Sequence, residues 1–167
     1  MKDECVNYLR LEGDEREIKR FVLQAKADYG DGQPQRFLLD NFIPFPKEFC
    51  YVRENDPSGE IKAKLPLKYR FDDLDEWCMA NWGTPTDAWD FTYNEKTDTY
   101  EFVAGCYPPV VGIIRISQLY PTLKFIYEYE NFRDPNKRSP DHAKFIFKNG
   151  EVLHEKYGIK LLKRRHL

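Results

Sequence analysis

Most of the residues that could support chemistry lie in one stretch, residues 77–90, which contains all three tryptophans of the chain. An aspartate can act as a general base, and a thiol just before a helix start is favoured as the reactive thiolate. Asp87 lies in this stretch, and Cys106 lies between an expected strand and an expected helix. We therefore consider a possible ligand, partner or enzyme site made of Asn81, Trp82, Thr84, Asp87 and Cys106.

Structural interpretations of the same residues are favoured. An aspartate in a turn usually accepts hydrogen bonds from neighbouring backbone N–H groups, and a lone cysteine is usually a small buried residue. Phosphate-binding glycine loops and the serine nucleophile elbow are missing from the sequence. His142, His154 and His166 lack the short spacings that zinc ligands need. The sequence thus assigns no catalytic residue, metal or cofactor, and an enzyme at Asp87 and Cys106 is a disfavoured alternative.

Length and composition predict one domain with a substantial core. The chain has 167 residues, 16% of them aromatic, and a net charge of −2. Its four cysteines form no Cys-x-x-Cys pair, which is typical of separate thiols in a reducing compartment. The first twenty residues are highly charged, and the longest uncharged run is interrupted by Pro108-Pro109. We therefore expect a cytoplasmic protein that does not enter a membrane.

The first half of the chain begins with a strand and a helix. Residues 5–12 alternate, with Asn7, Leu9 and Leu11 expected on one face. A helix is expected from Asp14 to about residue 28, with Glu17 completing a capping box and an inner stripe of Ile18, Phe21, Val22 and Ala25. Residues 29–70 are expected to form an insertion, in which 36–46 is an edge strand or a buried extended loop.

A second helix is expected from residue 72 or 73 to 82, where Gly83 ends it. Its first turn is acidic, and its inner stripe is Leu74, Trp77, Cys78 and Asn81, with Trp82 as a further candidate. A hairpin of residues 89–93 and 99–104 follows. A third helix then begins after Pro108-Pro109, with Val110, Ile113, Ile114 and Ser117 on its inner face.

The last elements are all strands. Residues 123–130 alternate and place Phe125, Tyr127 and Tyr129 on the core face. Residues 144–148 and 151–157 form a hairpin around Asn149-Gly150. The order predicts an α+β, ferredoxin-like split β-α-β-β-α-β domain over 1–167, with the insertion 29–70, a C-terminal hairpin extension 131–159 and a basic tail 160–167.

Charge is unevenly distributed along the chain. Residues 71–101 contain one lysine and nine acidic residues, whereas residues 131–167 contain ten basic and four acidic residues. The face of strand 123–130 opposite the core shows Lys124, Ile126, Glu128 and Glu130, and because this face is not basic an anionic ligand on the sheet is disfavoured. The basic residues that could contact nucleic acid are Lys160, Lys163, Arg164 and Arg165.

Several short motifs resemble the YubB-like ferredoxin-like family. They are Cys5-x-Asn7, Phe42-Ile43-Pro44-Phe45-Pro46, Asn81-Trp82-Gly83-Thr84, Asp87-Ala88, Phe102 followed by Pro108-Pro109, Leu119-Tyr120-Pro121-x-Leu123 and Tyr127-Glu128. Thr86 and Cys106 depart from the pattern, where an aromatic residue and a tryptophan are expected. The resemblance implies a ferredoxin-like fold and a phage or plasmid setting, and it implies no activity.

The favoured function is therefore a non-catalytic, macromolecule-binding protein of a mobile element, with a protein as its partner. One alternative is nucleic-acid binding through the basic C-terminal region, and another is an enzyme near Asp87 and Cys106. The sequence does not identify the partner or the oligomeric state.

Overall fold

The computed structural model describes residues 4–26, 37–46, 74–132 and 141–158. It is an α+β structure with three helices and a six-stranded sheet among these residues. The helices are α1 (Glu15–Ala25), α4 (Leu74–Asn81) and α5 (Val110–Leu119). The strands are β1 (Glu4–Glu12), β2 (Trp89–Asn94), β3 (Thr99–Gly105), β4 (Lys124–Asn131), β5 (Asp141–Lys148) and β6 (Glu151–Tyr157).

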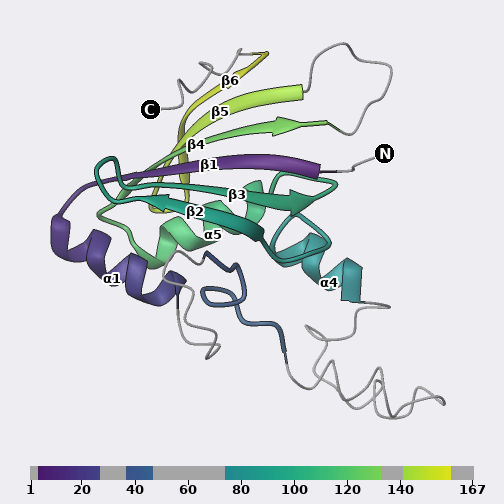
Figure 1. Cartoon of the computed structure of the whole chain (residues 1–167), viewed down its shortest axis with the longest axis horizontal. Coiled ribbons are helices and arrows are strands. Elements are labelled where there is room, and N and C mark those ends of the chain that lie inside the picture. Colours follow the sequence, from purple (N-terminus) through teal and green to yellow (C-terminus); the bar gives the residue numbers. More distant parts are fainter. Residues whose placement is uncertain (1–3, 27–36, 47–73, 133–140, 159–167) are drawn as a thin grey trace.

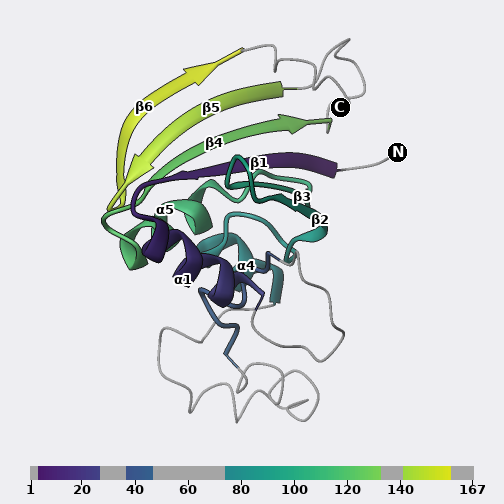
Figure 2. The ribbon, with the colours of Figure 1, turned by 60° about the vertical axis from the view of Figure 1, so that its left-hand side comes forward.

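The strands lie in the order β2-β3-β1-β4-β5-β6, and every neighbouring pair is antiparallel. All three helices lie on the same side of this sheet (Figure 1, Figure 2). The sheet therefore has one face covered by helices and a second face that no described helix covers. We call the second face the open face.

Strand β1 is central, and its side chains alternate as the sequence predicts. Asn7, Leu9 and Leu11 point towards the helices and are at most 2% exposed, whereas Val6 and Tyr8 are half-buried on the open face. Asn7 is a polar residue in the core, and its amide is fully used. Its Nδ2 donates to the backbone oxygens of Cys5 and Phe102, and its Oδ1 accepts from the Tyr127 hydroxyl at 2.6 Å. These bonds offset the cost of burying the amide.

Helix α1 starts at the predicted cap. The Asp14 carboxylate accepts from the backbone N–H groups of Arg16 and Glu17. The reciprocal half of the expected capping box is absent, because the Glu17 carboxylate binds the Arg20 guanidinium instead. The helix ends at Ala25, which is earlier than predicted.

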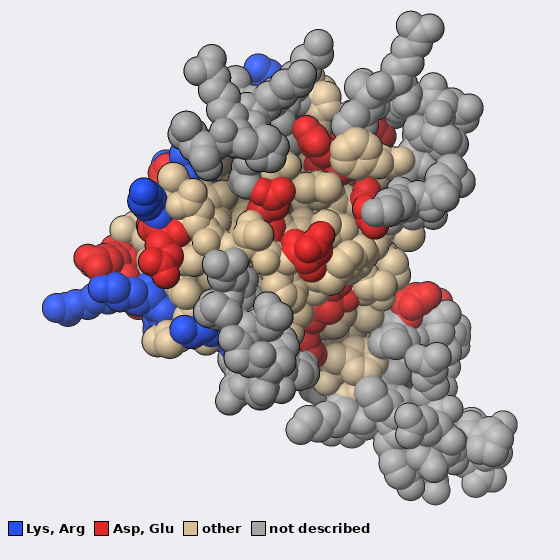
Figure 3. Space-filling model, in the orientation of Figure 1, with Lys and Arg blue, Asp and Glu red and all other residues tan. Residues whose placement is uncertain are grey.

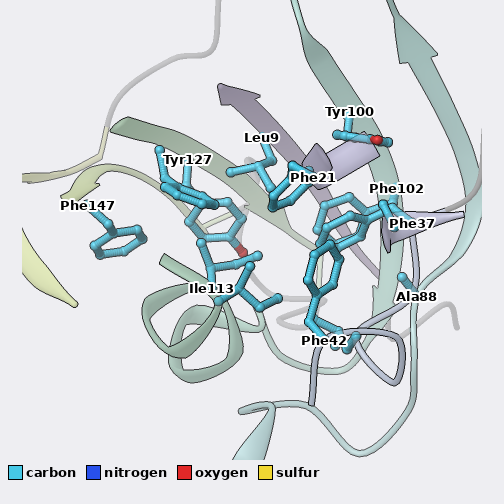
Figure 4. Packing of buried hydrophobic residues seen from close by; sticks show 14 of the residues in the cluster. Leu9, Phe21, Phe37, Phe42, Ala88, Tyr100, Phe102, Ile113, Tyr127 and Phe147 are labelled. Atoms are coloured by element: carbon cyan, nitrogen blue, oxygen red, sulfur yellow. The ribbon is translucent and has the colours of Figure 1, made fainter. Parts of the chain in front are cut away.

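The aromatic residues of the core meet around Phe21 of α1. Its ring lies 4.7 Å from that of Phe42 and 5.1–6.3 Å, centre to centre, from four others (Figure 4). Those four are Phe37, Tyr100, Tyr120 and Phe125. Residues 37–46 of the predicted insertion thus contribute directly to the core. They contain no regular strand, so the buried-loop interpretation of this segment is confirmed.

Helix α5 presents a slightly different inner face from the expected one. Gly112, Ile113, Ile116 and Ser117 are buried, while Val110 and Ile114 are only partly buried. Ser117 connects the helix to the last hairpin, since its hydroxyl accepts from the Gly150 N–H at 2.8 Å. Asn149 and Gly150 both have positive φ, which is the geometry of the predicted tight turn.

Trp77 anchors helix α4 in the core. It is 4% exposed, and its ring packs edge-on against those of Phe45 and Trp82, with centroids 5.0 and 5.4 Å away. Met79 lies on the same helix but is 36% exposed. The two residues therefore provide a buried and a surface position for comparison.

We expect Trp77→Ala to lower the free energy of unfolding by about 3–5 kcal/mol, because truncating a large buried ring leaves a cavity. Met79→Ala should lower it by less than about 1 kcal/mol. Urea unfolding followed by circular dichroism measures both values. Similar losses for the two variants would contradict the packing role of Trp77.

Candidate functional site

The Trp-rich stretch forms the end of α4, a turn and the start of β2. The N–H of Gly83 donates to the backbone oxygens of Cys78 and Met79 at 3.1 Å, and its φ of +84° ends the helix as the sequence predicts. The turn contacts helix α5 through the Gly112 N–H, which donates to the Trp82 oxygen at 2.9 Å. A Cβ at Gly112 would lie 3.0 Å from that same oxygen, so the close approach depends on glycine.

Asp87 joins residues 37–46 to this turn through hydrogen bonds. Its Oδ1 accepts from the N–H groups of Leu39 at 2.7 Å and Ala88 at 2.6 Å, and its Oδ2 accepts from the Asp40 N–H at 3.0 Å. Burial raises the pKa of Asp87 to about 6, although the three N–H donors favour the charged carboxylate and oppose the rise. Both carboxylate oxygens are therefore engaged in holding backbone.

The other polar groups of the turn also bind the scaffold. Asn81 donates to the Trp77 oxygen at 2.9 Å and accepts from the Arg115 guanidinium. The indole N–H of Trp82 donates to the Ile43 oxygen at 3.0 Å. The hydroxyl of the fully buried Thr84 donates to the Gly105 oxygen at 2.7 Å. Each hydrogen bond has a structural explanation, and a ligand-binding role for these residues stays a prediction.

Cys106 follows β3 directly and has a left-handed backbone, with φ of +57°. Its side chain is partly buried, and its backbone oxygen accepts from the Asn131 amide at 3.1 Å. Thr84 is hydrogen-bonded next to it at Gly105, whereas Asp87 is bonded to the segment 37–46. In the described structure no hydrogen bond joins Cys106 to Asp87, so the arrangement provides no assembled base and nucleophile.

Cys78, another cysteine among the described residues, offers little chemistry. Burial raises the pKa of the Cys78 thiol to about 12, which suppresses its thiolate near neutral pH. Across the described ranges, no group of three or more His, Cys, Asp or Glu residues is placed to hold a metal ion. None of the described helices is both long and apolar enough to cross a membrane. Lys160, Lys163, Arg164 and Arg165 lie outside the described residues.

The open face offers a second candidate surface, made of two adjacent rows of side chains. Strand pairing aligns Trp89, Val103, Val6 and Glu130 in the first row, across β2, β3, β1 and β4. The second row lies beside the first and passes through Tyr8, two residues after Val6 on β1. It consists of Thr92, Glu101, Tyr8, Glu128 and Lys144. Paired residues share one face of an antiparallel sheet, so each row is a set of direct neighbours.

This surface combines apolar and acidic side chains. Trp89 is 38% exposed, unlike Trp77 and Trp82, which are each 4% exposed. The two rows contain three glutamates, Glu101 on β3 and Glu128 and Glu130 on β4, and one basic residue, Lys144 on β5. In Figure 3 acidic side chains are spread over the middle of the view, where Figure 1 places β1 to β4, and most of the basic side chains lie towards its left margin, next to further acidic ones.

Comparisons with protein-family models, curated proteins and solved structures find no match to this chain.

Spacing alone does not identify Tyr8 and Trp89 as members of one surface. Alternation places Tyr8 on the side of its strand opposite Leu9, and Trp89 is the expected start of a strand. The position of Tyr8 in an alternating strand predicts which face of the sheet its side chain lies on. Its glutamate neighbours could be assigned only from the register of β1 with β3 and β4.

Asp87 gives a pH-dependent prediction. Its folded-state pKa of about 6 lies above its ordinary value of 3.8, so the folded protein binds the proton more tightly than the unfolded chain. Its contribution to folding stability therefore falls as pH rises from about 4 to about 6, by up to about 3 kcal/mol. Asparagine cannot titrate. The loss of unfolding free energy caused by Asp87→Asn should therefore be smaller at about pH 7 than at about pH 4, by up to about 3 kcal/mol.

Urea unfolding at both pH values measures this difference. Asp90→Asn is the matched control for the change from carboxylate to amide, because Asp90 is exposed. A larger cost of Asp87→Asn at the higher pH would show that the three N–H donors outweigh burial.

Proposed function

We propose that this chain is a non-catalytic, macromolecule-binding protein that binds a protein partner through the open face of its sheet. The observation that carries the proposal is the exposed Trp89 beside Val6 and Val103, on a face that no described helix covers. Exposed aromatic residues are enriched in the centres of protein interfaces. The candidate polar groups of the Trp-rich turn, by contrast, are hydrogen-bonded to the scaffold.

The ferredoxin-like, mobile-element assignment is part of the same proposal. It is supported by the succession β1, α1, β2, β3, α5, β4 along the chain and by the spatial run β2-β3-β1-β4. In this interpretation α4 is an added helix, and β5 and β6 extend the sheet beyond β4. The resemblance to the YubB-like family adds the phage or plasmid setting.

Affinity capture with an open-face variant tests the proposal. Wild-type protein should retain a specific partner from a lysate of the cells that produce it, and Trp89→Ser should lose most of that partner. Truncating an aromatic interface residue typically costs about 2 kcal/mol or more of binding free energy, or roughly thirtyfold in affinity.

Leu23→Ser is the matched control, because Leu23 is 63% exposed on α1, away from the open face. It should capture the partner as the wild type does. Equal capture by both variants, or no specific partner for the wild type, would refute the proposed surface. Urea unfolding of each variant confirms that the fold is retained.

The second candidate function is nucleic-acid binding, favoured by the excess of basic residues over 131–167. In a gel-shift assay the affinity should fall steeply between low and high salt. Replacing Lys160, Lys163, Arg164 and Arg165 by glutamine should weaken it further. An affinity that is insensitive to both changes would remove this alternative.

A further inference from the structure

We propose that two copies of this chain pair through the outer edge of β6. The two strands run antiparallel, Glu151 of each copy lies opposite Lys156 of the other, and the two sheets become one continuous sheet. This inference does not rest on the proposed function, because Trp89 lies on β2, at the opposite edge of the sheet.

Strand β6 is an edge strand whose side chains are exposed. It is the last strand of the sheet, and β5 is the only described strand that pairs with it (Figure 1, Figure 2). All seven of its residues are exposed, including the apolar Val152 and Leu153, at 47% and 54%. The outer edge of such a strand directs backbone N–H and C=O groups away from the sheet, where a further strand can pair with them. The edge of β6 can therefore accept an antiparallel strand.

A bulge in β6 brings two opposite charges onto the same face. Glu151 is paired with Lys148, and Lys156 is paired with Lys144, so five positions along β6 match four along β5. Residues five positions apart on a regular strand point to opposite faces. The extra residue, which accompanies a register shift in this hairpin, places both Glu151 and Lys156 on the open face, beside Lys148 and Lys144.

These two charges are available to a second copy. No ion pair among the described residues includes Glu151 or Lys156. Lys156 lies opposite Lys144 within its own chain, and like charges at opposite positions of a sheet repel each other. A glutamate on the outer side of Lys156 would offset that repulsion.

Antiparallel pairing of two β6 strands supplies this glutamate to both copies at once. When Glu151 lies opposite Lys156, the two-fold axis passes between Leu153 and His154, and symmetry forms the ion pair twice. Val152 and Leu153 of both copies then gather around the axis. Their burial adds to the ion pairs and to the new backbone hydrogen bonds.

Charge selects this register over its neighbours. Two other registers also match the faces of the two strands, one centred on Glu155 and the other on Lys156. Each of them places the central residue opposite its own copy, where like charges repel. A second copy in the register that joins Glu151 to Lys156 is therefore the occupant that matches the charge pattern of β6.

Sedimentation velocity of the full-length chain tests the inference. As the protein concentration rises from about 1 µM to about 1 mM, the mass should rise from that of one chain to that of two. The affinity should fall at high salt, because salt screens exposed ion pairs. A wild-type chain that stays monomeric at about 1 mM overturns the inference.

Two charge reversals test the register. Glu151→Lys and Lys156→Glu should each raise the dissociation constant of the dimer by about tenfold or more, because each places like charges opposite one another twice. An equimolar mixture of the two variants should dimerise about as tightly as the wild type, since each altered position then faces an opposite charge. Dimerisation that resists both reversals, or a mixture that stays monomeric, overturns the inference.

Matched controls make the same charge changes away from β6. Glu95→Lys and Lys96→Glu alter exposed residues between β2 and β3, and both variants should dimerise as the wild type does. Urea unfolding confirms that each variant is folded. If a reversed variant does not fold, Glu151→Gln and Lys156→Gln replace the reversals, and each should raise the dissociation constant by about twofold to tenfold. Unchanged dissociation constants, or equal weakening by the controls, overturn the inference.

Discussion

Burial of the Phe21 ring is the interaction on which the rest of the structure depends. Phe21 is fully buried and contacts rings from the segment 37–46, from β3 and β4, and from Tyr120 at the end of α5. Burying an aromatic ring of this size contributes roughly 2–3 kcal/mol before any specific ring contact is counted. Because segments far apart in the sequence converge on one ring, their positions are coupled, and the helices are confined to one side of the sheet.

Because the helices lie on one face of the sheet, the Trp-rich turn and the open face have different surroundings. The Trp-rich turn lies where α4, α5, β3 and the segment 37–46 meet, and its polar groups are needed to satisfy the backbone there. Buried N–H and C=O groups without partners are costly, so Asp87 and Thr84 serve the fold. The open face differs, because it carries Trp89, the one tryptophan that is more than slightly exposed, beside Val103 on a face that no described helix covers.

Much of the fold was predictable from local pattern. Alternation in residues 5–12 and 123–130 identified β1 and β4 and their buried faces, and Asp14 and Gly83 marked the start of one helix and the end of another. The inner face of α5 was less well predicted, since Ile116 is fully buried and Ile114 is not. A helix with apolar residues on several sides leaves its rotation to its tertiary neighbours.

The candidate site was likewise only partly predictable from the sequence. The sequence by itself determined which residue types are present and which of them alternate, because side-chain direction in a strand follows from its repeat of two. It could not determine that Asp87 binds Leu39 and Asp40, or that Glu101 and Glu128 flank Tyr8. Those contacts join residues between 47 and 120 positions apart, and only the register of the sheet and the packing around Phe21 decide such long-range neighbours.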